Sequence, residues 1–305
     1  MRHVYACPMR WADLDLLGHV NNVTYVDYLQ EARVDMMRIH APDRRAEELA
    51  EGVVVVRHEV SYQSPLDFRF RPVRIESWVT EIRAASFTLA YEVVDDTESG
   101  RVVYLAARSV LTPYVFRDRR PRRLTPAEQE ALGAFLEPAA ATRRASRSMP
   151  VRQGQGHYPV QVRFSDVDVY GHVNNVKYFE YFQEGRIALI ARLTGDETGP
   201  GAQERLAAHA QPGRRPGMVV AQIAVDYRRP ILFRPQPYDL WTHVSEVGRT
   251  SLVVEADICD GEAVLSHARA VLVVYDPLTR RPTPPSDAFR TQLEAALASP
   301  PPSAS

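Results

Sequence analysis

The chain has 305 residues, of which 45% are hydrophobic and 25% charged, and its formal net charge is -1. This composition is typical of a globular protein with a substantial core, and the balanced charge argues against a nucleic-acid-binding surface. Two cysteines exclude an extensive disulfide framework, and no apolar run approaches the roughly 18 residues that span a bilayer. We therefore expect a cytoplasmic protein without membrane insertion.

The first half of the chain predicts a short strand, a polar loop and a long helix. The loop reads DLDLLGHVNN at residues 13–22, and Asn21 or Asn22 is suited to cap the helix that follows. The helix has an apolar stripe at i, i+3 and i+4 spacing, formed by Tyr25, Val26, Leu29, Ala32 and Met36.

Four runs with strand character follow this helix. They read VVVVRHEVSY, PVRIESWVTEI, ASFTLAYEVVD and RVVYLAARSVLTPY. The links between them are mostly of hairpin length, which indicates an antiparallel sheet. A sheet of this kind with one apolar-striped helix packed on it has an α+β architecture.

The second half of the chain repeats the first. Residues 10–33 align with residues 163–186, and 14 of the 24 positions are identical. Two copies of this length indicate a duplicated domain rather than a solenoid. We therefore predict a first domain at 1–136, a linker at 137–157, a second domain at 158–298 and a disordered tail at 299–305.

The repeated loop motif resembles that of a known enzyme family. The pattern D-x-D-x-x-G-H-V-N-N-x-x-Y-x-x-Y, followed by Glu and Arg, resembles hotdog-fold acyl-CoA thioesterases of the 4-hydroxybenzoyl-CoA thioesterase type. It is also similar to the plant acyl-ACP thioesterases, although Leu17 and Tyr170 stand where those enzymes carry Asn. The resemblance implies two tandem hotdog domains, each an antiparallel sheet wrapped around a central helix. It also implies that the domains pair within the chain, and further association into a homo-oligomer is plausible.

This resemblance assigns the catalytic acid to Asp15 and Asp168. A carboxylate can attack a thioester directly or activate water, and the sequence leaves both routes open. His19 and His172 follow four residues later and are candidates to orient water, to bond the carboxylate or to protonate the leaving thiolate. The backbone N–H near Asn22 or Asn175 is the expected oxyanion donor, because a helix start presents unpaired N–H groups.

Further residues are expected to contact the substrate. Asn21 and Asn174 are expected mainly to cap their helices and secondarily to bind substrate or water. Tyr25 and Tyr178 are expected to line the pocket. By the same resemblance, Arg83 and Arg249 lie in strand turns that meet the nucleotide of coenzyme A, although both are also ordinary hairpin residues.

Four other acidic positions have structural interpretations that compete with catalysis. Asp13 and Asp166 are expected to be loop or capping groups. Glu31 and Glu184 are candidate bases, since another hotdog branch uses a helical Glu, but an ion pair with Arg33 or Arg186, or with a neighbouring strand, is the simpler expectation.

The leading prediction is an acyl-CoA thioesterase, with acyl-ACP as the alternative substrate. We expect no cofactor and no metal, because Asp13, Asp15 and His19 have no second cluster of ligands nearby. A hotdog hydratase or dehydratase is a second reading, but its D-x-N-P-x-H pattern is missing. A non-catalytic acyl-binding module is a third, and the retention of Asp and His in both copies argues against it.

Overall fold

The computed structural model describes residues 1–15, 18–40, 52–98, 100–139, 151–152, 154–195, 217–276, 278–279 and 281–297. The chain divides into two compact units, Met1–Arg144 (unit 1) and Ala145–Ser305 (unit 2). Leu17 and the expected tail lie outside the described residues.

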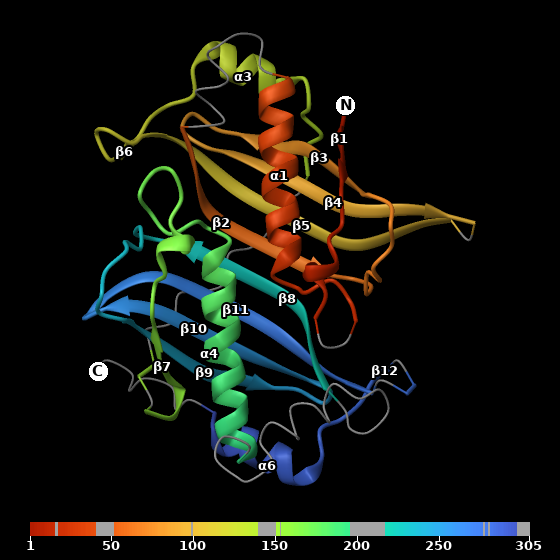
Figure 1. The fold of residues 1–305 in the computed structure, drawn as a ribbon, viewed down its shortest axis with the longest axis vertical. Coiled ribbons are helices and arrows are strands. Elements are labelled where there is room, and N and C mark those ends of the chain that lie inside the picture. Colours follow the sequence, from red (N-terminus) through yellow and green to blue (C-terminus); the bar gives the residue numbers. More distant parts are fainter. Residues whose placement is uncertain are drawn as a thin grey trace. The chain divides into compact units, whose positions relative to one another are not determined.

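Unit 1 contains the predicted strand, loop, helix and four strands, followed by a short strand and a second helix (Figure 1). Its elements are β1 (His3–Cys7), the 3-10 turn η1 (Trp11–Asp13), α1 (Thr24–Ile39), β2 (Val53–Tyr62), β3 (Val73–Ile82), β4 (Phe87–Thr97), β5 (Gly100–Val115), β6 (Arg120–Pro121) and α3 (Pro126–Gly133).

Unit 2 repeats this order of elements. They are the 3-10 turn η2 (Gly154–Gly156), β7 (His157–Val160), η3 (Phe164–Asp166), α4 (Lys177–Thr194), β8 (Gly217–Tyr227), β9 (Tyr238–Val247), β10 (Ser251–Asp260), β11 (Ala263–Asp276), β12 (Arg281–Pro282) and α6 (Asp287–Ala295).

Within each unit the strands pair antiparallel, as expected. The order in unit 1 is β1-β3-β4-β5-β2, and the order in unit 2 is β7-β9-β10-β11-β8. The expectation of successive hairpin neighbours is wrong for β2, which pairs with β5 instead of β3. The link between β2 and β3 therefore crosses from one side of the sheet to the other, and it carries residues 63–72 past the end of the polar loop.

The long helix of each unit buries its apolar face against the sheet. The predicted stripe on α1 is buried, and α1 packs on β1 and β3, while α4 packs on β7, β9 and β10. The N-caps are Val23 and Val176, so the expected cap at Asn21 or Asn22 is wrong by one or two residues. Within the described part of the chain, no helix is long and apolar enough to cross a membrane.

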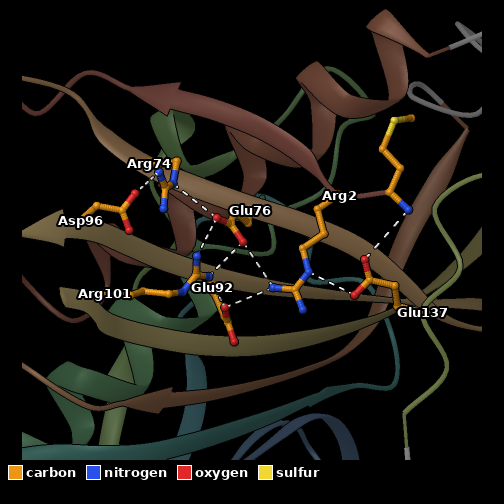
Figure 2. Close-up of polar contacts among 8 residues, drawn as sticks. Arg2, Arg74, Glu76, Glu92, Asp96, Arg101 and Glu137 are labelled. Atoms are coloured by element: carbon orange, nitrogen blue, oxygen red, sulfur yellow. Dashed lines mark hydrogen bonds and ion pairs between the residues drawn. The ribbon is translucent and has the colours of Figure 1, made fainter.

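An ion-pair network joins neighbouring strands of the unit 1 sheet (Figure 2). Glu76 on β3 accepts from both Arg2 and Arg101, at 3.2 Å and 2.9 Å. Glu92 on β4 accepts from the same two arginines, at 3.2 Å and 2.6 Å. The Arg2 guanidinium also lies 3.7 Å from the ring centroid of Trp78. Single surface pairs contribute little, but this network joins four segments of the unit.

Helices α3 and α6 were not expected from the sequence pattern. Thr125 and Glu128 form a capping box at the start of α3, and Arg122 donates to the buried Glu128 carboxylate at 2.6 Å. After α3 the chain runs beside β3, where the N–H of Glu137 donates to Val79 at 2.8 Å. The start of the range expected as a linker is thus bonded to unit 1, and its end forms η2 and the first residue of β7.

The two cores differ at one buried polar pair. His58 on β2 is fully buried, and its Nδ1 lies 2.7 Å from Oγ of Ser109 on β5. In unit 2, the cross-strand pair that aligns with it is Ile223 and Ala270. Burial lowers the pKa of His58 to about 3, and the nearby Arg33 guanidinium contributes.

We expect His58 to make unit 1 less stable in acid. An unfolded histidine titrates near 6.5, so between about pH 3 and pH 6.5 the unfolded state binds one more proton than the folded state. Stability therefore falls on acidification by up to about 1.4 kcal/mol per pH unit from this residue. His58→Gln should give a shallower dependence of unfolding free energy on pH between 4 and 6.5. His157→Gln is the control and should keep the slope of the parent. An unfolding free energy of His58→Gln that depends on pH as steeply as that of the parent would contradict this account.

A methyl group at Gly156 should destabilise unit 2. A Cβ there would lie 1.8 Å from the backbone oxygen of Thr242, which cannot rotate away, whereas a Cβ at Gly154 meets nothing within 4 Å. Overpacking against backbone costs roughly 1–3 kcal/mol. We expect Gly156→Ala to lower the melting temperature measured by circular dichroism, with Gly154→Ala close to the parent. Equal melting temperatures for the two variants would show that the contact is relieved without cost.

Candidate active site

The polar loop of unit 1 is a short hairpin that leads directly into α1. The N–H of Asn21 donates to the carbonyl of Asp13 at 2.8 Å, and the N–H of Asp15 donates to that of His19 at 2.8 Å. Gly18 closes the turn with φ of 79°, a left-handed conformation that favours glycine.

Unit 2 repeats this hairpin nearly bond for bond. The N–H of Asn174 donates to Asp166 at 2.8 Å, and the N–H of Asp168 donates to His172 at 2.9 Å. Gly171 has the same φ of 79°. Two separate segments of sequence therefore produce one loop geometry.

The first aspartate of each loop is a structural anchor, in agreement with its expected role. Asp13 is 4% exposed, and its carboxylate accepts from the Tyr28 hydroxyl at 2.5 Å and from Arg10 at 2.9 Å. Asp166 is equally buried and accepts from the Tyr181 hydroxyl at 2.7 Å. These bonds attach each loop to the first turns of its helix.

The second aspartate of each loop lies half-buried, where a substrate can reach it. The Asp15 Oδ1 accepts from the N–H of His19 at 3.3 Å, while the Asp168 Oδ1 accepts from the N–H of Tyr170 at 2.9 Å. Burial raises the pKa of the Tyr25 phenol, and Tyr62 and the Asp15 carboxylate add to the rise. Asp168 contributes in the same way to the raised pKa of Tyr178, for which burial is again the main cause. Both carboxylates therefore lie near the start of their helix.

The two histidines have different neighbours. His19 Nε2 lies 3.5 Å from the carboxylate of Asp67, in the segment that links β2 and β3. The residue that aligns with Asp67 in unit 2 is Leu232, so His172 has no carboxylate at that position. Both rings are partly exposed beside their loop.

The side chain of the first asparagine in each loop bonds the backbone at the helix entry. Asn21 Oδ1 accepts from the N–H of Val23 at 2.9 Å, and Asn174 Oδ1 accepts from that of Val176 at 3.0 Å. With the N–H of Asn21 bonded to Asp13, the N–H of Asn22 has no acceptor among the described residues. It lies at the entry to α1, between the loop and the helix.

Four tyrosines pack at or bond to these helix starts. Two of them, Tyr62 and Tyr227, were not predicted from the sequence. Tyr25 and Tyr178 are buried, and Tyr178 accepts from the N–H of Ile231 at 3.0 Å. Tyr62 and Tyr227 donate to the carbonyls of Asn22 and Asn175, at 2.6 Å and 2.8 Å. Residues 60–65 (VSYQSP) align with residues 225–230 (VDYRRP), and both tyrosines occupy the third position of this alignment. The repeat could therefore have identified them.

Arg83 and Arg249 do not lie beside the loop of their own unit. The start of β3 pairs with the end of β1, which leads into the loop, and Arg83 follows the other end of β3. Nine residues of strand separate those ends by roughly 30 Å. Arg83 pairs there with Glu81 at 2.8 Å. Arg249 occupies the equivalent turn after β9.

The expected ion pair between Glu31 and Arg33 is not formed. Glu31 is exposed and Arg33 is 8% exposed, because residues two apart lie on different faces of a helix. Glu184 is likewise exposed. Among the residues with described positions, no cluster of three His, Cys, Asp or Glu side chains is arranged to hold a metal ion.

Comparison with known proteins places this geometry in a family. Residues 9–135 and 162–293 each match the thioesterase-like superfamily. A Bacillus subtilis protein of uncharacterised function, YsmA, is 32% identical over 120 residues, which cover 38% of this chain and 69% of YsmA.

Solved structures share the fold over most of the chain. The 12:0-ACP thioesterase from Umbellularia californica has a TM-score of 0.66 at 17% identity, with 90% of this chain and 94% of that chain covered. An acyl-ACP thioesterase from Bacteroides thetaiotaomicron has a TM-score of 0.62 at 14% identity, with 89% and 97% covered. The fold is thus the hotdog thioesterase fold, with a large antiparallel sheet and few helices. Since the family match spans most of the sequence, the chain belongs to the thioesterase-like superfamily and is a thioester hydrolase.

Proposed function

We propose that the chain hydrolyses acyl-CoA thioesters and that Asp15 and Asp168 are the reacting carboxylates. The observation that carries this proposal is the duplicated loop, which holds a half-buried carboxylate near the start of a buried helix in both units. If Asp15 and Asp168 were ordinary turn residues, their positions would not need to be fixed by the buried Asp13 and Asp166. We also infer that each sheet curves around its long helix, as in a hotdog domain.

The chemistry requires a nucleophile and a donor for the oxyanion. In unit 1 the N–H of Asn22 polarises the thioester carbonyl, and such a donor typically contributes about 3 kcal/mol to lowering the barrier. The Asp15 carboxylate either attacks the carbonyl carbon, which expels the thiolate and leaves a mixed anhydride that water cleaves, or it removes a proton from the attacking water. Both routes yield a free acid and a thiol, and thiolate is a good leaving group without strong acid catalysis.

Unit 2 uses Asp168 with the corresponding helix start. Its carboxylate is oriented by the N–H of Tyr170 instead of that of the histidine. His19 and His172 lie at the end of each hairpin, where a ring nitrogen can donate to the departing thiolate. In unit 1, Asp67 beside His19 orients that ring.

Replacing both carboxylates should abolish hydrolysis. We expect Asp15→Asn and Asp168→Asn each to remove the turnover of one site, and the double variant to lose at least about 100-fold in kcat with little change in melting temperature. Thiol release from a panel of acyl-CoA substrates measures this. Asp118→Asn, on the surface of unit 1, is the matched control. A double variant that hydrolyses as fast as the parent would exclude both residues from the reaction.

Removing the phenol that holds the first aspartate should weaken both stability and turnover. Tyr28→Phe leaves the buried Asp13 carboxylate without one of its donors, which typically costs about 1–3 kcal/mol. We expect a lower melting temperature and a several-fold loss in kcat, because the loop carrying Asp15 loosens; Tyr181→Phe should act likewise on unit 2.

The control is Tyr158→Phe. The hydroxyl of Tyr158 has no acceptor in the described part of the chain. If Tyr28→Phe lowers the melting temperature but leaves kcat unchanged in an Asp168→Asn background, the bond stabilises the fold without positioning the carboxylate.

A further inference from the structure

Large aromatic side chains lie exposed beside the loop of unit 2. Phe164, the first residue of η3, is 81% exposed, and Phe233 is 51% exposed. Their ring centroids are 6.0 Å apart in an edge-to-face arrangement. Exposed aromatic pairs next to a reaction centre commonly mark a surface that contacts a ligand.

Three exposed arginines lie close in sequence to the two members of this aromatic pair. Arg163 precedes Phe164, and Arg228 and Arg229 follow the end of β8; all three are exposed and form no ion pair within the part of the chain that the structure describes. The backbone N–H groups of Arg228 and Arg229 donate to the carbonyl of Leu265, at 2.9 Å and 3.0 Å, which fixes their place. We call Arg163, Phe164, Arg228, Arg229 and Phe233 the Arg-Phe rim.

The rim is attached to the elements that carry Asp168. Phe164 begins the turn that ends at the buried Asp166. Ile231, two residues after Arg229, accepts from the N–H of Val173 in the loop at 2.9 Å. Tyr227, just before Arg228, bonds the helix entry. A ligand on the rim is therefore next to the loop of the same unit.

The aligned positions in unit 1 lack this charge. Gln63 and Ser64 replace Arg228 and Arg229, and Arg10, which aligns with Arg163, is paired with Asp13. Asp67 also adds a negative charge where unit 2 has Leu232. The cationic rim is thus a property of unit 2.

We propose that the Arg-Phe rim binds the 3′-phospho-ADP end of coenzyme A in the thioester hydrolysed at the Asp168 loop. Guanidinium groups match phosphate oxygens, and coenzyme A carries a diphosphate and a 3′-phosphate. An adenine ring stacks on exposed aromatic side chains. A carrier protein would offer acidic side chains to the arginines but no planar base to the phenylalanines, so the combination favours the nucleotide.

This inference rests on the proposed function and proposes a nucleotide contact beside the Asp168 loop. Arg249 was expected to meet the nucleotide, but it lies at the end of β9 remote from the loop of its own unit. Arg228 and Arg229 adjoin that loop instead.

The first test is direct binding of adenosine 3′,5′-bisphosphate by calorimetry, which needs no turnover. We expect the double variant Arg228→Gln/Arg229→Gln and the single variant Phe233→Ser each to weaken binding, the double variant about 10-fold or more. Arg281→Gln, an exposed arginine on β12, should bind like the parent. No binding by the parent, or equal binding by parent and double variant, would overturn the proposal.

The second test compares two thioesters of one acyl group, acyl-CoA and acyl-N-acetylcysteamine, in the Asp15→Asn background. The arginine double variant should raise KM for acyl-CoA about 10-fold, leave kcat unchanged and leave the N-acetylcysteamine thioester unaffected. Equal effects on both thioesters would overturn it. If the parent binds the bisphosphate through the rim yet hydrolyses neither thioester, the proposed function fails and the nucleotide site stands.

Discussion

The bond between a buried carboxylate and a helix phenol holds the candidate active-site loop of each unit against its long helix. Asp13 and Asp166 are each 4% exposed, and each accepts from a tyrosine one turn into its helix. A buried carboxylate is stable only with such donors, so the hairpin can take one position relative to the helix. The half-buried Asp15 and Asp168 lie two residues further along the same hairpin, so their positions relative to the helix are fixed as well. In the proposed mechanism, the position of both carboxylates thus depends on a buried residue that does not react itself.

The duplication has kept this loop and changed its surroundings. Gly18 and Gly171 share the same φ, and the hairpin bonds agree to about 0.1 Å. Around them, His58 and Ser109 in one core correspond to Ile223 and Ala270 in the other, and the neutral pair Gln63 and Ser64 corresponds to two arginines. The two candidate sites therefore share the backbone geometry of the loop and differ in the N–H that bonds the second aspartate and in the charge nearby.

Much of this architecture could be predicted from the sequence because the chain contains its own comparison. Helix α1, the four main strands and the D-x-D loop repeat, and their apolar periodicity agrees between copies. The pairing of β2 with β5 could not be predicted, because local patterns do not report which distant strand is the neighbour. Helix α3 was missed although Thr125 and Glu128 form a readable capping box. The cap at Val23 was unexpected because Asn21 bonds the turn before the helix instead of the helix itself. The supporting tyrosines Tyr62 and Tyr227 lie 40 and 52 residues from the carbonyls they bond, beyond the reach of any local motif.

The most direct test of the central claim is a crystal structure with a bound, non-hydrolysable acyl-CoA analogue. The account predicts that the carbonyl carbon of the analogue lies about 3–3.5 Å from a carboxylate oxygen of Asp15 or Asp168, with its oxygen at the N–H of the adjoining helix entry. An analogue bound with its carbonyl distant from both aspartates would contradict it.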